Sequence, residues 1–322
     1  MTDPKVNITI PTYNRAHCLG KAIDAALKQS YSSFTVTVVD DGSTDNTERL
    51  IERYVAHPNF CYIKLDKNVG TANAKNVSML LSDYDAITFH DSDDIPKENK
   101  ILMQARALSQ RGHVADQILD WGLHGYEDNQ ELLIDVVVGA HEMIKLNGNV
   151  HKMEKTLSLI DDFFPTLQFP SKTEGDWILI NSGLFRKNVF EQVGGYLDSV
   201  EEDRELRNRT IGCGFMYYFL ESVLLTKIEM AASLTVDEDT GYQGQKRIRD
   251  RNEVRERTRI MLPKFGQKSL RDELRVEVDL ADVGLEYVSN PDLLTFNTKI
   301  AHTPGTRESL TRGLNFARAI GD

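Results

Sequence analysis

The stretch Thr35-Val-Thr-Val-Val-Asp-Asp-Gly42 indicates the fold class of this chain. Its run of β-branched residues predicts a strand, and the two aspartates and the glycine predict a loop at the carboxyl end of that strand. Strands of this kind alternate with helices of amphipathic spacing through the first 110 residues. The expected strands are residues 6–10, 35–39, 60–65 and 84–90, and the expected helices are residues 15–30, 44–55 and 71–81. This alternation predicts an α/β fold with a doubly wound, mostly parallel sheet flanked by helices.

Local signals predict where some elements begin and end. Asn14 is suited to cap the first helix, and Pro96 lies near the start of a long fourth helix, where its missing N–H costs little. The regular alternation is lost between residues 111 and 175, which we interpret as an insertion or a subdomain. Order returns with a strand over residues 177–185 and a short helix over residues 187–193 that ends in two glycines.

Composition and charge exclude several classes of protein. The chain has 322 residues, of which 49 are acidic and 38 basic, so its net charge is −11, and 40% of its residues are hydrophobic. This is enough apolar sequence for a folded core, and the acid excess argues against a protein that coats nucleic acid. Three scattered cysteines favour a reducing compartment over a disulfide framework. We see no secretory signal, and the longest apolar run, residues 215–225, is shorter than the ~20 residues of a membrane span, so we expect a cytoplasmic protein.

Carboxylates follow three of the four predicted strands. Ligands bind at the carboxyl ends of the strands in such sheets, so the loops that begin at Asp40, Asp66 and Asp91 should meet around a ligand. The tripeptide Asp-x-Asp occurs three times, but only residues 91–93 directly follow a predicted buried strand. Hard oxygen ligands suit Mg²⁺ or Mn²⁺, which are held by carboxylates together with substrate phosphates. The motif predicts a metal and diphosphate site, and the alternative is a solvated acidic turn in which Asp94 caps a helix.

Five blocks of sequence form an ordered set between about residues 5 and 220. The blocks are Val6-Asn-Ile-Thr-Ile-Pro-Thr-Tyr-Asn-Arg15, Val38-Val-Asp-Asp-Gly-Ser-Thr-Asp-Asn-Thr47, Asn68-Val-Gly-Thr-Ala-Asn-Ala-Lys-Asn76, His90-Asp-Ser-Asp-Asp94, and Ser182-Gly-Leu-Phe-Arg186 with Val193-Gly-Gly-Tyr-Leu-Asp-Ser-Val-Glu-Glu-Asp203. Together they resemble the family 2 glycosyltransferases, inverting enzymes of the GT-A fold that use a nucleotide-activated sugar. The resemblance implies a catalytic domain over residues 1–230, with a nucleotide-sugar half over about 1–110 and an acceptor half over about 111–230. Residues 231–322 would form a mainly helical C-terminal extension with a basic helix.

The resemblance also implies roles for individual residues. Those that bind the nucleotide sugar would be Pro11, Thr12, Asn14, Asp40, Asp41, Asn68, Lys75 and Asp91. Asp40 would receive the base, through the ring N–H if that base is uracil, and Asp91 would face the ribose or the sugar. Asp93 would bind the metal, Mn²⁺ or Mg²⁺, and Asp203 would be the catalytic base. Lys75 stands where the family usually has arginine, so the charge is kept and the planar fork of donors is lost.

The residues support an inverting transfer on physical grounds as well. The acceptor hydroxyl must lose a proton, and the departing diphosphate must be stabilised. Asp203 follows Glu201 and Glu202, and these like charges raise its pKa toward the working pH of a base. A metal at Asp93 would neutralise the charge that grows on the diphosphate. The alternative interpretation of residues 201–203 is an acid-rich helix N-terminus that favours the helix dipole.

A basic segment stands out in this acidic chain. Residues 245–275 hold 11 basic and 5 acidic residues, a local charge of +6 that leaves −17 for the rest. Arg247, Arg251, Arg255 and Arg259 are four apart, so they share one face of a helix. The candidates for their partner are the donor diphosphate, an anionic lipid surface at the inner face of the membrane, a charged acceptor and the acidic catalytic domain itself. A solvated helix packed on acidic neighbours is the simplest interpretation.

These features together predict a metal-dependent, inverting transferase that moves one hexosyl or N-acetylhexosaminyl group from a nucleotide diphosphate sugar, with a UDP-sugar favoured. The expected acceptor is a glycan or glycolipid in surface polysaccharide, capsule or lipopolysaccharide biosynthesis. The Gln-x-x-Arg-Trp motif of processive members is absent, which favours one transfer per encounter. Two alternatives are a catalytically degenerate protein that binds a sugar nucleotide or glycan, and a sugar nucleotidylyltransferase, which should carry a Gly-rich phosphate loop. The acidic rim predicts that the anionic donor binds together with a divalent cation.

Overall fold

The computed structural model of the chain describes residues 3–113, 131–153, 180–229, 241, 243–264 and 267–321. Most of the stretch where the alternation of strand and helix is lost lies outside these ranges, as does the first part of the strand expected over residues 177–185. Ile180–Ser182 form a 3₁₀ turn, and a strand follows only at Leu184–Arg186.

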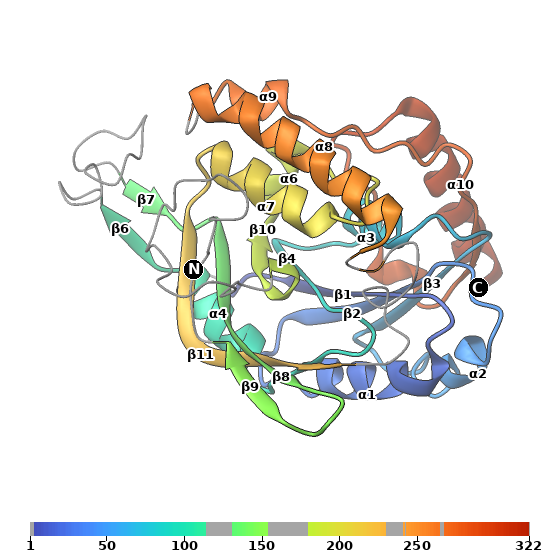
Figure 1. Cartoon of the computed structure of the whole chain (residues 1–322). Coiled ribbons are helices and arrows are strands. Elements are labelled where there is room, and N and C mark those ends of the chain that lie inside the picture. Colours follow the sequence, from blue (N-terminus) through green and yellow to red (C-terminus); the bar gives the residue numbers. More distant parts are fainter. Residues whose placement is uncertain are drawn as a thin grey trace.

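A ten-stranded sheet runs through the molecule in the order β12-β3-β2-β1-β4-β10-β8-β11-β5, with β9 paired to β8 (Figure 1). The strands are β1 Val6–Thr12, β2 Phe34–Asp40, β3 Phe60–Leu65, β4 Ala86–Phe89, β5 Ile95–Pro96, β8 Val136–Ile144, β9 Val150–Met153, β10 Leu184–Arg186, β11 Tyr217–Ile228 and β12 Leu285–Val288. Strands β1 to β4 are mutually parallel, as predicted. The sheet as a whole is mixed, because β10, β5 and β12 add antiparallel pairs. Strands β6 (Arg111–His113) and β7 (Glu131–Leu133) pair separately.

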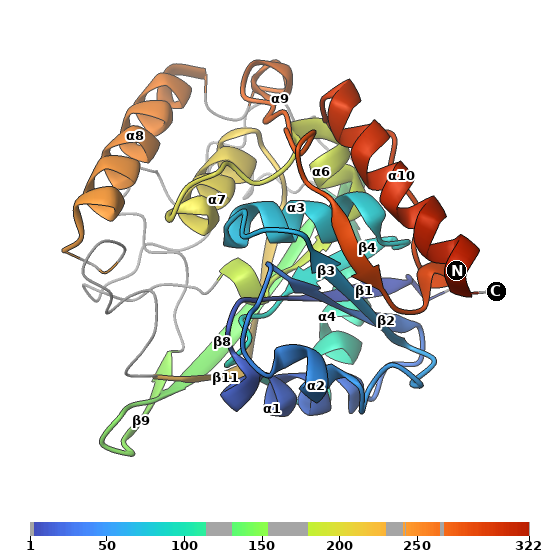
Figure 2. The ribbon, with the colours of Figure 1, turned by 90° about the vertical axis from the view of Figure 1, so that its right-hand side faces the viewer.

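Helices cover both faces of the sheet (Figures 1 and 2). They are α1 Ala16–Leu27, α2 Thr47–Ile51, α3 Thr71–Leu81, α4 Lys100–Leu108, α6 Lys187–Val193, α7 Glu202–Gly212, α8 Gln245–Met261, α9 Leu270–Glu273 and α10 Pro304–Gly321. Neighbouring residues of a strand point to opposite faces, so Val38 packs in the core beneath α1 and Val39 in the core beneath α3. Two buried apolar layers therefore hold the sheet between its helices, and α8 lies on the outer side of α7 (Figure 2).

Local prediction was accurate where the pattern was regular. The strand over residues 60–65 and the helices over 71–81 and 187–193 have the predicted bounds. Two predictions about helix starts were wrong. Pro96 lies in β5, opposite Leu225, and the fourth helix begins only at Lys100.

The cap of the first helix also comes from elsewhere. Asn14 has a left-handed backbone, with φ of 52°, and its side chain makes no cap. The amide N–H of Ala16 instead donates to Oδ2 of Asp45, at 3.0 Å, from the loop after β2. The N-terminus of α1 is thus capped by the loop after β2, and the sequence around residue 14 alone cannot show this contact.

The C-terminal segment packs on the same sheet as the N-terminal half. Strand β12 pairs antiparallel with β3, and Leu310 and Leu314 of α10 join the apolar layer that contains Ile63. The division into a domain over residues 1–230 and an extension stays a prediction. Among the helices of the described ranges, none is long and apolar enough to cross a membrane.

Candidate active site

The carboxyl ends of β1, β2 and β4 lie side by side at one rim of the sheet. Thr12 is opposite Asp40 in the register of β1 and β2, and Thr9 is opposite Phe89 in that of β1 and β4. The amide of His90 continues this pairing by donating to the carbonyl of Thr9 at 2.9 Å. The loops that follow these three strands therefore meet, as the topology predicted.

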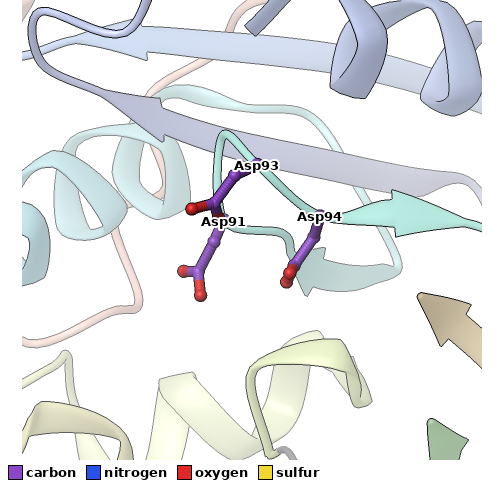
Figure 3. A group of neighbouring side chains, drawn as sticks. All are labelled: Asp91, Asp93 and Asp94. Atoms are coloured by element: carbon purple, nitrogen blue, oxygen red, sulfur yellow. The ribbon is translucent and has the colours of Figure 1, made fainter. Parts of the chain in front are cut away.

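Three aspartates of the loop between β4 and β5 form an acidic triad, defined here as Asp91, Asp93 and Asp94 (Figure 3). Each offers a carboxylate oxygen, and these oxygens lie within 4.8 Å of one another. Asp94 is fully buried, and neither of its carboxylate oxygens has a hydrogen-bond partner in the part of the chain that the structure describes. Burial raises the pKa of Asp94 to about 7, and burial together with the charge of Asp91 raises the pKa of Asp93.

A lysine that the sequence analysis missed lies against the triad. Nζ of Lys227, from β11, is 2.9 Å from Oδ2 of Asp91 and 3.7 Å from Oδ1 of Asp94. Although burial opposes it, the charges of Lys227 and Lys75 lower the pKa of Asp91 to about 2. The register explains the contact, because Thr226 is opposite Ile95, the residue after Asp94. The one sequence signal for this contact was a lysine near the end of the predominantly apolar β11. This lysine lies more than 130 residues downstream of the triad, so the sequence alone did not connect the two.

The two aspartates after β2 brace neighbouring segments. Asp40 is fully buried, and its carboxylate accepts hydrogen bonds from the Tyr62 hydroxyl and the Ser43 amide. Asp41 accepts from the amides of Val69 and Gly70, at 2.6 and 2.9 Å, which ties the loop after β2 to the loop after β3. Burial raises the pKa of Asp41 to about 6, although these two hydrogen bonds act to lower it. Base recognition by Asp40 stays a prediction, and in this structure both of its oxygens are already engaged.

The other residues predicted to bind the nucleotide lie at the same rim. Pro11 and Thr12 are the buried last residues of β1, and the Thr12 hydroxyl has no partner among the described residues. The side-chain oxygen of Asn14 accepts from the amide of Thr44 at 2.8 Å, which joins the loops after β1 and β2. Asn68 is exposed on the loop that Asp41 holds. The structure thus brings these side chains together without testing what they bind.

Lys75 links the rim to a second group of acids at the start of α7. It is 1% exposed, and its Nζ lies 2.9 Å from Oε1 of Glu202. Burial disfavours its charged form, but Glu202, Asp91 and Asp203 outweigh burial and raise its pKa. The charges of Asp91 and Asp203 therefore both act on one ammonium group, which couples the predicted donor side electrostatically to the predicted base.

Asp203 lies in the first turn of α7 and is partly exposed. Burial, followed by the charges of Glu202 and Glu201, raises its pKa to about 6, while Lys75 and Arg204 oppose the rise. The acid-rich helix N-terminus that we considered as an alternative is therefore present, and it is also the environment that raises this pKa.

The basic helix α8 contacts the acids that precede Asp203. Arg247 and Arg251 lie 3.1 and 3.2 Å from Oε1 of Glu201, which is almost fully buried. Asp250 accepts from the amide of Val200 at 2.9 Å, so α8 also fixes the backbone just before α7. Of the candidate partners of the arginines, the acidic catalytic half itself is the one that the structure shows.

The sequence model of glycosyl transferase family 2 matches residues 7–170, more than half of the 322 residues and the whole of the rim described above. The chain belongs to glycosyl transferase family 2. The chain is 27% identical to GlyG of Streptococcus pneumoniae over 197 residues, which cover 58% of each chain. It is 36% identical over 107 residues to the Escherichia coli glucosyltransferase WfgD, covering 32% of this chain and 41% of that one. The chain thus spans little more than half the length of GlyG.

Solved structures confirm the fold. The structure of Staphylococcus aureus TarS 1-349 in complex with UDP matches with a TM-score of 0.56 and 18% sequence identity, over 84% of this chain and 69% of that one. The predicted GT-A fold, with a mixed sheet between helices and further helices after it, is therefore confirmed.

Proposed function

We propose that the chain is an inverting, metal-dependent glycosyltransferase that moves a single sugar from a nucleotide diphosphate sugar to an acceptor hydroxyl. The observation that carries the proposal is the position of Lys75, which lies 2.9 Å from Glu202, the neighbour of Asp203 on α7, and whose pKa is also raised by Asp91 at the rim. Direct transfer needs a donor site and a base near each other. Lys75 interacts electrostatically with Asp91 of the candidate donor site and with Asp203, the candidate base. Family membership supports the class of reaction.

The acidic triad fits a hard divalent cation. Its oxygens lie within 4.8 Å of one another, and the buried oxygens of Asp94 lack hydrogen-bond partners in the described ranges. Carboxylate oxygens are the ligands that Mg²⁺ and Mn²⁺ prefer. We propose Asp93 as one ligand, with Asp91 and Asp94 beside it. A bound ion supplies positive charge that stabilises the departing diphosphate.

Asp203 is the proposed base. With a pKa of about 6, its carboxylate is mostly ionised near neutral pH and can take the proton of an acceptor hydroxyl as that oxygen attacks the anomeric carbon. Attack from the face opposite the diphosphate inverts the configuration. Lys75 limits the repulsion between this carboxylate and those at the rim.

A UDP-sugar donor and a glycan or glycolipid acceptor are the proposed substrates. TarS was solved with UDP and with UDP-GlcNAc, and WfgD is named as transferring glucose from UDP-Glc to a GlcNAc-diphosphoundecaprenol acceptor. We infer a hexosyl or N-acetylhexosaminyl transfer in surface polysaccharide biosynthesis, at the cytoplasmic side of a membrane. The nucleotide pocket would be lined by Pro11, Thr12, Asn14, Asp40, Asp41 and Asn68.

Donor binding and transfer can be tested separately. Thermal unfolding of the protein with UDP-, GDP- and dTDP-sugars, each with and without Mn²⁺, should show metal-dependent stabilisation by UDP-sugars. Asp203→Asn should keep this stabilisation and lose both transfer and hydrolysis of the donor. Stabilisation by none of the sugar nucleotides would contradict the proposal. A wild-type protein that binds donor but neither hydrolyses nor transfers it, across a broad acceptor panel, would favour the degenerate binding protein.

Membrane contact through α8 is a separate proposal. Arg247 and Arg251 already pair with Glu201, whereas Arg259 is exposed and lies 2.5 Å from Glu256 of the same helix. Cosedimentation with vesicles that contain anionic lipid should weaken in Arg255→Gln/Arg259→Gln if this face touches a membrane. Equal cosedimentation of wild type and variant would rule out that contact.

A further inference from the structure

Lys227 occupies the position in the acidic triad where a cation would be bound. Its Nζ lies 2.9 Å from Asp91 and 3.7 Å from Asp94, and the register of β11 against β5 sets this position. The side chains of Lys227 and Asp91 are 25% and 31% exposed, whereas that of Asp94 is 1% exposed. The Lys227 side chain is therefore partly open to solvent, as is Asp91, whereas Asp94 is not.

Asp94 shows that the triad is built to hold a positive charge. Its carboxylate is buried with no hydrogen-bond donor to either oxygen among the described residues, and it forms an ion pair with Lys227 at 3.7 Å. A buried carboxylate left this way is costly unless a cation neutralises it. A divalent ion held by Asp93, with Asp91 and Asp94 beside it, would lie ~2.0–2.1 Å from its ligand oxygens, in the space next to that ammonium group.

We propose that Lys227 is an exchangeable counter-ion of the donor site: its ammonium group and a divalent ion held at Asp93 compete for the neighbouring carboxylates of Asp91 and Asp94. The inference rests on the proposed metal site, and it adds a residue that controls metal affinity. Lysine suits this role because its charge is a compact group on a flexible four-carbon stem, which can leave without moving β11. Once displaced, the ammonium group remains beside the carboxylates that hold the ion, where a donor diphosphate would lie. The competition therefore makes metal binding weak without donor and stronger with it.

Mn²⁺ binding without any donor tests the competition directly. Titration followed by electron paramagnetic resonance should show that Lys227→Met binds Mn²⁺ at least ~10-fold more tightly than wild type, because a neighbouring positive charge is lost. Lys64→Met is the matched control, since Lys64 also pairs with two carboxylates, Glu48 and Glu286, at 3.1 and 3.0 Å, but away from the triad. Its Mn²⁺ affinity should equal that of wild type. Lys227→Gln provides a second variant if the methionine variant does not fold, as judged by circular dichroism.

The coupling between metal and nucleotide gives an independent readout. UDP should increase the Mn²⁺ affinity of the wild type by a larger factor than that of Lys227→Met, in which no ammonium group has to be displaced. Unchanged or weaker Mn²⁺ affinity in both Lys227 variants would overturn the proposal. Failure of UDP to bind the wild type would instead overturn the proposed function, because the titration without donor still measures the competition.

Discussion

Replacing Lys75 by methionine should destabilise the protein far more than loss of a surface ion pair. Its Nζ lies 2.9 Å from Oε1 of Glu202, and the two side chains are 1% and 12% exposed. At an effective dielectric constant of about 20, charges at this distance attract by about 6 kcal/mol before desolvation is counted. Removing one partner of a buried pair leaves the other charge uncompensated, which costs about 3–5 kcal/mol. We expect a loss in the free energy of unfolding within that range.

Urea unfolding followed by circular dichroism measures this loss against a matched control. Lys5 lies 2.8 Å from Asp83, almost the same distance, but the side chains are 39% and 53% exposed. Lys5→Met should therefore cost no more than about 1 kcal/mol. The double variant Lys75→Met/Glu202→Gln should recover at least about 1 kcal/mol of the loss, because the uncompensated charge is gone. Equal costs for Lys75→Met and Lys5→Met would refute the argument that burial gives the pair its importance.

Two further predictions concern the pH dependence of the base, and a third concerns the backbone at Gly194. The pKa of Asp203 is raised to about 6, and the base must be ionised to act. The acidic limb of the pH profile of kcat/KM should therefore fall about tenfold per pH unit below pH 6. An acidic limb that begins only near pH 4 would contradict the assignment of Asp203 as the base. The double variant Arg247→Gln/Arg251→Gln leaves Glu201, whose charge raises the pKa of Asp203, paired with Arg204 alone, so the same limb should move to higher pH, and an unmoved limb would show that α8 does not act on the base. Gly194→Ala should cost at least about 2 kcal/mol in urea unfolding, because φ is 76° and a Cβ would lie 2.0 Å from a backbone carbonyl oxygen; a cost below 1 kcal/mol would contradict it.

Much of the N-terminal half could be predicted because its information is local. The strands and helices between residues 6 and 81 follow from alternation and amphipathic spacing, although the N-terminus of α1 is capped by Asp45 from the loop after β2. Elements fixed by distant partners could not be predicted in this way. Pro96 lies in a strand because Leu225 pairs with it, and β12 extends the sheet because β3 offers an open edge.

The candidate site was predictable to the same extent and for the same reason. The topological rule places residues 11–14, 40–41 and 91–94 at one rim, and the structure brings them together there. Their detailed partners depend on contacts that the rule does not contain. The Tyr62 hydroxyl and the Ser43 amide donate to the two oxygens of Asp40. The first of these contacts depends on the register in which β3, which carries Tyr62, pairs with β2.

The cations of the site complete the account of the acid excess. Each group of acids has a basic side chain from another element of the fold: Lys227 for the triad, Lys75 for Glu202, and Arg247 with Arg251 for Glu201. A rim of free carboxylates would repel an anionic donor until a metal arrived, which was the expectation from net charge alone. With these four internal cations, the repulsion at the rim is already reduced before any metal binds. Under the proposed function, the role of a divalent ion would then shift from admitting the donor to stabilising the diphosphate as it departs, which is the step at which its charge would be most effective.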